Sequence, residues 1–188
     1  DMIAFDFLTP LLEFVASILG FVYVFLIATQ RSSGWIFGIV SAFFFAVFFY
    51  RMQTWGLFSQ QIAYIILGFY GLFTWSAKKE DLPIRSSGKS IWLWILGTIL
   101  LGFIFFISFT SLPNWRSFLD AQFFVFSLIA TLLTTRKILE NWHIWIVVNV
   151  VGTIWFAYEH WWYTAALYLA YLVLAINGLR KWKKALSA

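Results

Sequence analysis

The sequence predicts an all-α integral membrane protein with seven transmembrane helices. Of its 188 residues, 62% are hydrophobic and only 11% are charged, whereas a soluble domain carries about 25% charged residues. The apolar residues gather into seven runs, each close to the roughly 20 residues that cross a bilayer core as a helix. Such a chain cannot hide all its apolar side chains in its own interior, so we expect lipid to cover them.

The seven predicted helices follow one another through short polar breaks. The longest break, Lys78–Ser90, contains Pro83 and Gly88, residue types that mark turns and loops. The other breaks are Arg31–Gly34, Arg51–Thr54, Ser111–Trp115, Arg136–Asn141 and Glu159–His160. The helices between them are predicted at 11–29, 34–51, 55–77, 91–110, 117–135, 142–158 and 161–180.

Positive charge is concentrated in alternate breaks, which predicts the orientation of the chain. With seven spans the loops alternate between two sides, and 11 of the 13 Lys and Arg residues fall on one side. Because cytoplasmic loops carry the excess of Lys and Arg, we expect the amino terminus outside and the carboxyl terminus in the cytoplasm. The eleven residues are Arg31, Lys78, Lys79, Arg85, Lys89, Arg136, Lys137, Arg180, Lys181, Lys183 and Lys184.

The charge pattern and the missing motifs exclude several classes of function. Topology accounts for the net charge of +5, so no basic face is left over for nucleic acid. The chain has no Cys, which excludes disulfides and thiolate metal sites. The sequence contains no Gly-rich phosphate loop and no serine-hydrolase or zinc-hydrolase motif. We therefore expect neither enzymatic activity nor a cofactor.

The first part of the chain recurs in the last part at a spacing of 107 positions. Three Trp residues align with Trp, and Gly71 aligns with Gly178. We therefore predict two three-helix repeats, 11–77 and 117–183, joined by a cytoplasmic loop and a linker helix at 78–116. The linker helix makes the repeats parallel, an arrangement that places substrate at the repeat interface in transporters. The alternative is a duplication retained only for packing. The aligned Trp pairs are Trp35 with Trp142, Trp55 with Trp162, and Trp75 with Trp182.

Candidate binding residues share one face of the third helix of each repeat. Spacings of three and four place Gln61, Tyr64 and Trp75 on this face in the first repeat. Tyr168 and Trp182 take the same face in the second repeat, and Tyr168 aligns with Gln61. A Gln at membrane depth needs hydrogen-bond partners, which a substrate or a neighbouring helix can supply.

A second candidate stripe lies in the stretch from Thr135 to Asn149. Trp142, Trp145 and Asn149 follow at spacings of three and four, which place them on one helical face. An Asn and two indoles on one stripe are costly in lipid. The stripe therefore predicts a cavity that holds a flat, polar molecule.

Three further polar residues have two readings each. Gln60 lies on a different face of its helix from Gln61, and Asn177 lies opposite Tyr168. Both faces of a straight helix cannot line one cavity, so Gln60 and Asn177 contact either substrate or neighbouring helices. Gln122 sits one turn inside the helix at 117–135, where a ligand contact and a water-facing helix start are the alternatives.

These residues resemble the bacterial PnuC family of nicotinamide riboside transporters over about 11–183. The resemblance implies seven helices in a three-plus-one-plus-three arrangement, similar to the sugar facilitators of the SWEET type. It also implies a multi-pass protein of the bacterial cytoplasmic (inner) membrane. The matching residues are Thr135-Arg136-Lys137, Glu140-Asn141-Trp142, Trp145, Asn149, Gln61, Tyr70-Gly71, Trp75, Tyr168, Asn177-Gly178 and Trp182.

The resemblance implies transport of nicotinamide riboside, a cationic pyridinium that carries a carboxamide and a ribose. Transport would be facilitated diffusion with alternating access, and cytoplasmic phosphorylation would trap the riboside. Gln61, Asn149 and Tyr168 would hold its polar groups. Trp75, Trp142 and Trp182 would stack on the ring or gate the site. The rival readings are a facilitator of thiamine or a sugar, and a non-transporting membrane scaffold. Lipid-facing aromatic residues leave room for a homo-oligomer.

Overall fold

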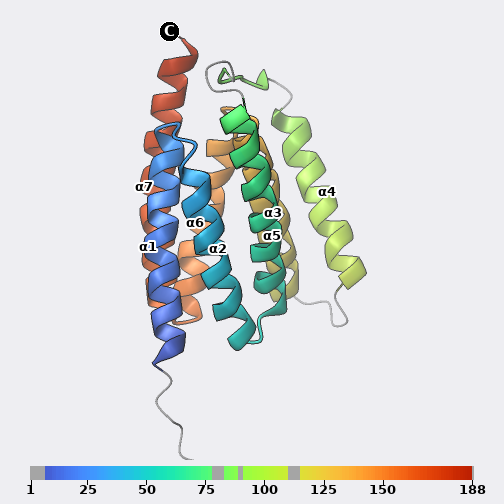
Figure 1. Cartoon of the computed structure of the whole chain (residues 1–188). Helices are drawn as coiled ribbons and strands as arrows, with labels where there is room; N and C mark the ends of the chain where they lie inside the picture. Colours follow the sequence, from blue (N-terminus) through green and yellow to red (C-terminus); the bar gives the residue numbers. More distant parts are fainter. Residues whose placement is uncertain (1–6, 78–82, 89–90, 110–114, 188) are drawn as a thin grey trace, which may run out of the picture.

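Seven helices make up the part of the chain that the structure, a computed structural model, describes: residues 7–77, 83–88, 91–109 and 115–187. The predicted boundaries agree with the structure within three residues, except at the end of the last helix. The helices are α1 (Leu8–Ala28), α2 (Gly34–Arg51), α3 (Trp55–Ala77), α4 (Ile91–Phe109), α5 (Trp115–Thr135), α6 (Asn141–Tyr158) and α7 (Trp162–Leu186) (Figure 1).

The last helix is longer than predicted. The apolar run ends at position 180, but α7 continues to Leu186 through Lys181, Lys183 and Lys184. Hydropathy marks where the lipid-facing part stops, whereas Lys and Arg are good helix formers that keep the backbone helical beyond it. The prediction of 161–180 was therefore wrong for the carboxyl end of the helix.

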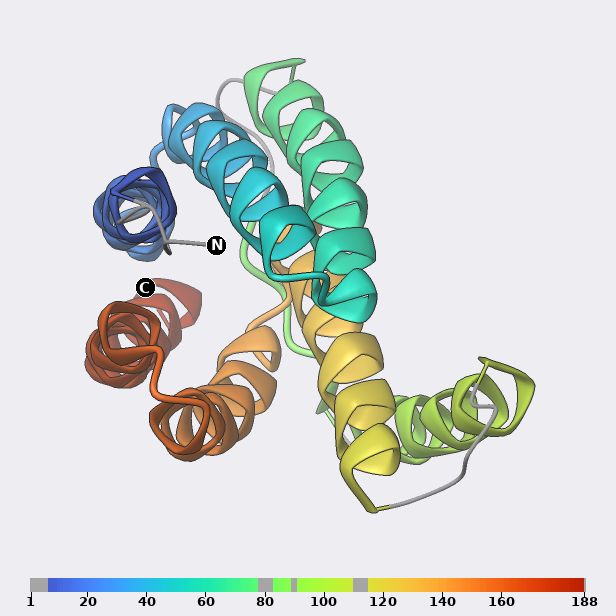
Figure 2. The ribbon, with the colours of Figure 1, turned by 90° about the horizontal axis from the view of Figure 1, so that it is seen from below.

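Six helices close into a ring, and α4 lies outside it. Around the ring, the neighbouring pairs are α1 with α2, α2 with α3, α3 with α5, α5 with α6, α6 with α7, and α7 with α1. Among the described residues, α4 packs against α5 alone, and Figure 2 shows it apart from the other helices. The interior of the ring is thus built from the three helices that precede α4 and the three that follow it.

The helices have the lengths and surfaces of membrane spans. Within the described ranges, α1, α2, α3 and α7 are long and apolar enough to cross a membrane, and shorter apolar stretches occur in α4 and α5. Large apolar side chains such as Ile66, Phe73 and Ile154 are more than half exposed on the outside of the ring. Apolar surface on this scale needs a lipid cover. The protein is a multi-pass membrane protein.

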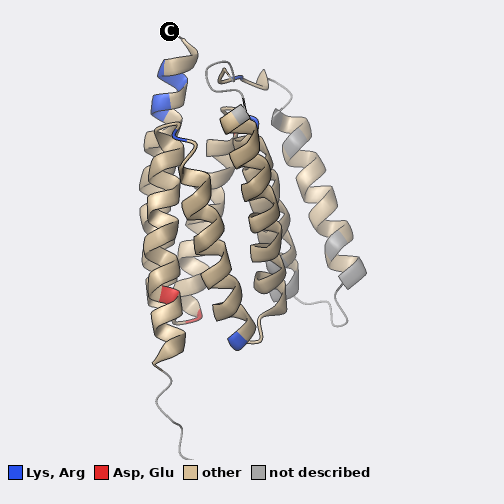
Figure 3. Cartoon of the chain, viewed as in Figure 1, with Lys and Arg blue, Asp and Glu red and all other residues tan. Residues whose placement is uncertain are grey.

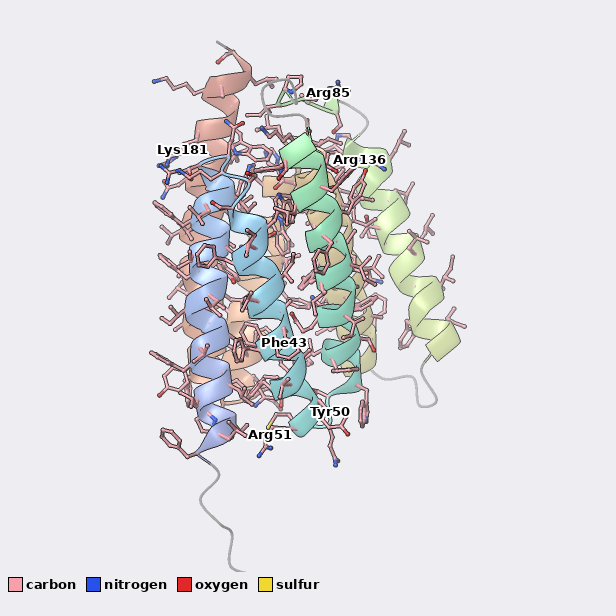
Figure 4. All side chains as sticks on the ribbon, in the orientation of Figure 1. Phe43, Tyr50, Arg51, Arg85, Arg136 and Lys181 are labelled. Carbon is pink, nitrogen blue, oxygen red and sulfur yellow. The ribbon has the colours of Figure 1, made fainter. Side chains whose placement is uncertain are left out.

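The two ends of the ring differ in charge. Lys and Arg residues gather at one end, the end of the carboxyl terminus (Figure 3). Figure 4 labels Arg85, Arg136 and Lys181 there, and Arg51 at the other end. We call the first the basic end. The other is the Glu13 end, because α1 begins there and Glu13 lies in its second turn. Lys78, Lys79 and Lys89, which belong to the predicted charge pattern, lie outside the described residues.

Within the described ranges, four helices end in the same type of turn. In each turn, a backbone N–H bonds the carbonyl oxygen five residues earlier, as Arg31 does with Leu26 at 2.9 Å and Ile138 with Leu133 at 3.0 Å. This is the Schellman motif, which usually needs Gly at the left-handed position. Here the left-handed residues are Gln30 (φ 59°), Gln53 (φ 55°), Lys137 (φ 52°) and His160 (φ 60°).

The polar segment at residues 83–88 crosses the basic end, and Glu140 holds it there. The backbone N–H of Arg85 donates to the carbonyl oxygen of Lys137, in the α5–α6 turn, at 3.0 Å. The buried Glu140 carboxylate accepts hydrogen bonds from Ser86 Oγ at 2.5 Å and Ser87 N at 2.9 Å. Burial raises the pKa of the Glu140 carboxyl, but these hydrogen bonds outweigh burial and leave the pKa below its ordinary value.

Candidate functional site

A cavity lies inside the ring and is lined by residues from all six of its helices. Its volume is about 100 Å³, well above the roughly 10–15 Å³ that a cavity needs in order to hold one water. The cavity is the candidate functional site, because a small-molecule pocket between helices is the usual binding place in a helical bundle.

The wall of the cavity is aromatic and carries no formal charge. No Lys, Arg, Asp or Glu is among its described lining residues. Aromatic faces attract flat and cationic groups, worth about 0.5–2 kcal/mol each. The aromatic lining residues are Tyr23, Trp35, Phe45, Phe49, Tyr64, Trp142, Trp145, Phe156, Tyr168 and Tyr171.

Three amide side chains add hydrogen-bonding groups to this wall. Gln60 and Gln61 come from α3 and Asn149 comes from α6, and all three are buried. Gln60 Nε2 donates to the Tyr64 hydroxyl at 2.7 Å. The carbonyl oxygens of Gln60 and Asn149 have no hydrogen-bond partner among the described residues. Because an unpaired buried carbonyl is costly, the site suits a molecule that brings its own N–H or O–H donors.

Two residues of the cavity wall carry unpaired donors as well. Trp35 and Trp142 both line it, and the indole N–H of each has no acceptor in the part of the chain that the structure describes. Acceptor groups of a bound molecule, such as a carboxamide oxygen or a hydroxyl, would satisfy them. The cavity therefore offers both donors and acceptors on an apolar, aromatic surface.

Glycines allow the large rings to approach this closely. A Cβ atom on Gly152 would stand 2.3 Å from Cδ1 of Tyr168, and one on Gly178 would stand 2.6 Å from Cζ2 of Trp142. A Cβ on Gly71 would likewise stand 2.5 Å from Cε2 of Trp35. These distances are too short for any side chain. The close helix packing at these positions therefore holds Tyr168, Trp142 and Trp35 in the wall.

Four tryptophans pack together at the basic end of the cavity. The ring centroids of Trp35 and Trp75 are 5.6 Å apart, and those of Trp142 and Trp182 are 5.3 Å apart, both in edge-to-face contact. Trp75 and Trp182 contact each other at 6.3 Å. Trp35 and Trp142 line the cavity, whereas Trp75 and Trp182 lie behind them. We call these four residues the tryptophan cluster.

A second aromatic cluster stands at the other end of the cavity. The Trp161 ring contacts Phe49 and Phe156, each with a centroid distance of 5.8 Å. Phe49 and Phe156 line the cavity, and Trp161 lies outside them, next to the start of α7. An aromatic layer thus lies toward each end of the cavity.

Six of the ten predicted binding residues line the cavity. Gln60 and Gln61 both do so, although the sequence placed them on different faces of their helix. Neighbouring helical residues differ by only about 100° in direction, and the cavity spans both directions. The structure brings these six together, and their binding roles stay predictions. They are Gln60, Gln61, Tyr64, Trp142, Asn149 and Tyr168.

Four predicted residues do not line the cavity. Trp75 and Trp182 belong to the tryptophan cluster, and Trp75 Nε1 donates to Thr135 O at 3.0 Å. Asn177 is exposed on α7, on the face opposite Tyr168. Gln122 lies against α4, where its Nε2 donates to Ile99 O at 3.4 Å and its side chain packs on Gly102. The packing of α4 on α5, which hydropathy does not specify, turns Gln122 away from the ring interior.

The candidates named from the sequence leave out six of the aromatic lining residues, which are Tyr23, Trp35, Phe45, Phe49, Phe156 and Tyr171. Trp35 and Tyr171 are the repeat partners of Trp142 and Tyr64 at the spacing of 107, so the repeat carried the signal that would have included them. Tyr23 has no aromatic partner at that spacing, and no sequence pattern distinguished it from the other aromatic residues of the first helix.

Comparison with known proteins identifies the chain's relatives. Residues 10–184 match the family described as "Nicotinamide mononucleotide transporter". The chain is 25% identical over 201 residues to the "Nicotinamide riboside transporter PnuC" of Escherichia coli (strain K12), covering 91% of this chain and 84% of that one. It is 24% identical over 180 residues to the "Riboflavin/roseoflavin transporter RibM" of Streptomyces davaonensis, covering 90% and 83%.

A solved structure has the same fold. The protein described as "Crystal structure of the Vitamin B3 transporter PnuC" matches with a TM-score of 0.80. The match covers 94% of this chain and 82% of that chain at 22% sequence identity. The likeness extends over almost all of the described helices, and it concerns the fold.

Proposed function

This chain belongs to the nicotinamide mononucleotide transporter family, and from that membership we propose that it carries nicotinamide riboside across the membrane. The family is one of membrane transporters rather than enzymes. Relatives that share most of their length with this chain are named as transporters of the riboside. The proposal for this chain rests on those names and on the chemistry of its cavity.

The observation that carries the proposal is the combination of aromatic wall and unpaired amide oxygens. Nicotinamide riboside contains a cationic aromatic ring, a carboxamide and ribose hydroxyls. Indole and phenol faces attract the ring. The unpaired oxygens of Gln60 and Asn149 accept from the carboxamide N–H groups or the hydroxyls. An apolar guest would leave these oxygens unpaired, and it would bind poorly for that reason.

The uncharged lining favours the riboside over the phosphorylated mononucleotide. A phosphate carries up to two negative charges and needs cations or several donors when it leaves water. The described lining residues include no Lys or Arg. We therefore propose that phosphorylation of the riboside in the cytoplasm prevents its return and draws net uptake inward by facilitated diffusion.

We assign binding roles by position in the cavity. Gln61, Asn149 and Tyr168 hold polar groups of the substrate, supported by Gln60 and Tyr64 beside them. Trp142 presents its ring edge and N–H to the site. Trp75 and Trp182, which lie behind the wall, act as a gate at the basic end rather than as stacking partners. Asn177 and Gln122 have no part in binding in this proposal.

We propose further that the ring consists of two parallel three-helix repeats, 11–77 and 117–183, with 78–116 as the linker. Two features support the arrangement. The contact between α1 and α7 corresponds to the contact between α5 and α3, as a two-fold axis along the membrane normal requires. The paired glycines Gly71 and Gly178 also receive the paired rings of Trp35 and Trp142.

The proposed orientation puts the basic end in the cytoplasm of a bacterial cell, with the amino terminus outside. The concentration of Lys and Arg at that end supports it (Figure 3). A homo-oligomer through the lipid-facing surfaces also stays part of the proposal. Apolar side chains such as Leu93 and Ile104 are more than half exposed on α4, which packs on α5 alone among the described residues.

The main alternative is a facilitator of another flat, polar molecule. The relative named as a riboflavin and roseoflavin transporter is almost as similar to this chain as the riboside transporters are. Thiamine and sugars are further candidates. The cavity between the helices argues against a scaffold, whose interior would be filled by side chains.

Uptake by proteoliposomes separates these candidates. Vesicles containing the purified protein receive labelled nicotinamide riboside, riboflavin, thiamine or a monosaccharide, with protein-free vesicles as the control. The proposal expects saturable uptake of the riboside, and no uptake of the others above the control. Saturable uptake of riboflavin or thiamine with none of the riboside would replace the proposed substrate.

A further inference from the structure

Polar contacts join the two halves of the ring at both ends of the cavity. One half is α1–α3 and the other is α5–α7. At the Glu13 end, the carboxylate of Glu13 on α1 contacts Thr164 on α7. At the basic end, Lys137 in the α5–α6 turn contacts Gln30 in the α1–α2 turn. Each contact therefore crosses between the halves, and the cavity lies between the two contacts.

The Glu13 carboxylate accepts two hydrogen bonds from the start of α7. Its Oε1 accepts from the backbone N–H of Thr164 at 3.0 Å and from Thr164 Oγ1 at 2.7 Å. Thr164 lies in the first turn of α7, where N–H groups lack partners within the helix and the helix dipole favours negative charge. The carboxylate is buried, as is Thr164.

Thr164 connects this contact to the site, because it lines the cavity whereas Glu13 does not. Glu13 therefore acts on the cavity through Thr164 and the start of α7. The neighbouring ring of Trp161, one residue before α7 begins, packs on Phe49 and Phe156 of the cavity wall. A displacement of the start of α7 away from α1 would move this aromatic layer.

The basic end carries a contact that involves the opposite charge and is exposed rather than buried. Lys137 Nζ donates to Gln30 Oε1 at 3.3 Å and lies 4.9 Å from the centroid of the Trp75 ring. Trp75 in turn donates from Nε1 to Thr135 O in the other half. These contacts hold the turns of the two halves together above the tryptophan cluster.

We propose that Glu13 is a positioning residue of the transport cycle, which latches α1 to α7 and keeps the cavity closed at the Glu13 end. Lys137 and Gln30 form the matching latch at the basic end. In alternating access one end opens while the other stays closed, so each latch must be separable without disrupting the helices. The latch at the Glu13 end consists of two hydrogen bonds from Thr164, at the start of α7, to one carboxylate. The latch at the basic end is one hydrogen bond between two side chains. Both can separate while the helices stay intact. The inference rests on the proposed transport function, but its test needs no substrate.

The absence of Cys from the chain makes a labelling test possible. The reporter is Thr131→Cys, a close match in size, because Thr131 is buried and lines the cavity. The reporter protein is reconstituted into vesicles, and a membrane-impermeant maleimide is added from one side at a time. A tag at the carboxyl terminus reports the orientation of the protein in the vesicles. The measured quantity is the labelling rate from each end.

The latch proposal expects opposite effects from the two ends. Glu13→Ala should raise labelling from the Glu13 end about fivefold or more, as the loss of a charge-assisted contact implies, and should not raise it from the basic end. Gln30→Asn should raise labelling from the basic end and should not raise it from the Glu13 end. Asn tolerates the left-handed backbone, but its side chain is too short to reach Lys137. Glu13→Gln keeps an acceptor oxygen, so its labelling rate from the Glu13 end should be much lower than that of Glu13→Ala.

A matched control lies at the Glu13 end. Arg51 Nε donates to Thr9 Oγ1 at 2.8 Å, which joins α1 to α2 within one half. Thr9→Ala should therefore leave labelling from both ends unchanged. Thr164→Val, which removes only the hydroxyl of the latch, provides a second test if Glu13→Ala does not yield folded protein by size-exclusion chromatography.

Unchanged labelling from the Glu13 end in both Glu13→Ala and Thr164→Val would overturn the proposal. An equal rise from both ends would also overturn it, because that result indicates general loosening of the fold. The unlabelled reporter protein is titrated with nicotinamide riboside in parallel. Absence of binding there would count against the proposed substrate, while the labelling rates would still decide the latch.

Discussion

Gln30 and Lys137 stand 107 positions apart in the chain and are joined by a hydrogen bond of 3.3 Å from Lys137 Nζ to Gln30 Oε1. Both end a helix in the left-handed conformation, with φ of 59° and 52°. Gln53 and His160 share the same separation and the same conformation. A non-glycine residue costs about 1–2 kcal/mol in this conformation. Its recurrence at one spacing favours two copies of one structural unit that meet at Gln30 and Lys137.

Removing a cavity amide should weaken substrate binding. Asn149→Ala deletes a buried, unpaired acceptor in the wall, and we expect the dissociation constant of nicotinamide riboside to rise about tenfold. Asn177→Ala removes the same group from the exposed face of α7 and should leave the constant unchanged. Calorimetric titration measures both. Equal effects of the two substitutions would remove Asn149 from the site.

The unphosphorylated ligand should bind far more strongly than the phosphorylated one. Because the described lining residues contain no cation, nicotinamide mononucleotide should bind about a hundredfold more weakly than the riboside or worse. Competition of the mononucleotide against bound, labelled riboside measures the ratio. Similar affinities would mean that a cation outside the described lining reaches the phosphate.

Adding one methyl group at Gly178 should destabilise the protein. The new Cβ would stand 2.6 Å from the Trp142 ring, which is buried and cannot move freely. We expect Gly178→Ala to lower the unfolding free energy by about 1–3 kcal/mol, read as a lower melting temperature in detergent. Gly97→Ala in α4, where no atom of the described residues lies within 4 Å of the new Cβ, is the control. A melting temperature as high as that of the control would contradict the packing described here.

The segment held by Glu140 should loosen in acid. Since hydrogen bonds lower the pKa of the Glu140 carboxyl in the folded protein, the carboxylate stabilises the fold above its unfolded pKa. That stabilisation is lost as the pH falls through the lowered pKa. Hydrogen exchange at Ser87 and Gly88, corrected for intrinsic rates, should therefore show protection at neutral pH that declines in acid. In Glu140→Gln the protection should be weaker and should not depend on pH. A wild-type profile as flat as that of the variant would refute the role of the carboxylate.

The sequence predicted the helices well because length and apolar content determine a membrane span locally. It placed six helices within three residues of their observed ends. The end of α7 was missed because charged residues continue a helix into water, as Lys183 and Lys184 do. The position of α4 outside the ring was not predicted, since an apolar run does not specify which neighbour it packs against.

The candidate site was predicted in part, for a related reason. Helical periodicity placed Gln61 and Tyr64 on one face of α3 and Tyr168 on the matching face of α7. In the structure both faces turn inward. Periodicity does not give the depth of a residue along the ring, so it could not separate Trp142, which lines the cavity, from Trp182, which lies behind it. Gln122 faces α4 because of the position of that helix, which only the tertiary structure supplies.

The most direct test of the account is whether the cavity is the route of the riboside. In proteoliposomes containing Thr131→Cys, uptake of labelled nicotinamide riboside is measured before and after reaction with a small, permeant maleimide. Val147→Cys, on the exposed surface of α6, serves as the control. The account predicts that modification at 131 abolishes uptake and that modification at 147 leaves it unchanged. Full uptake after complete modification at 131 would show that the riboside does not pass through this cavity.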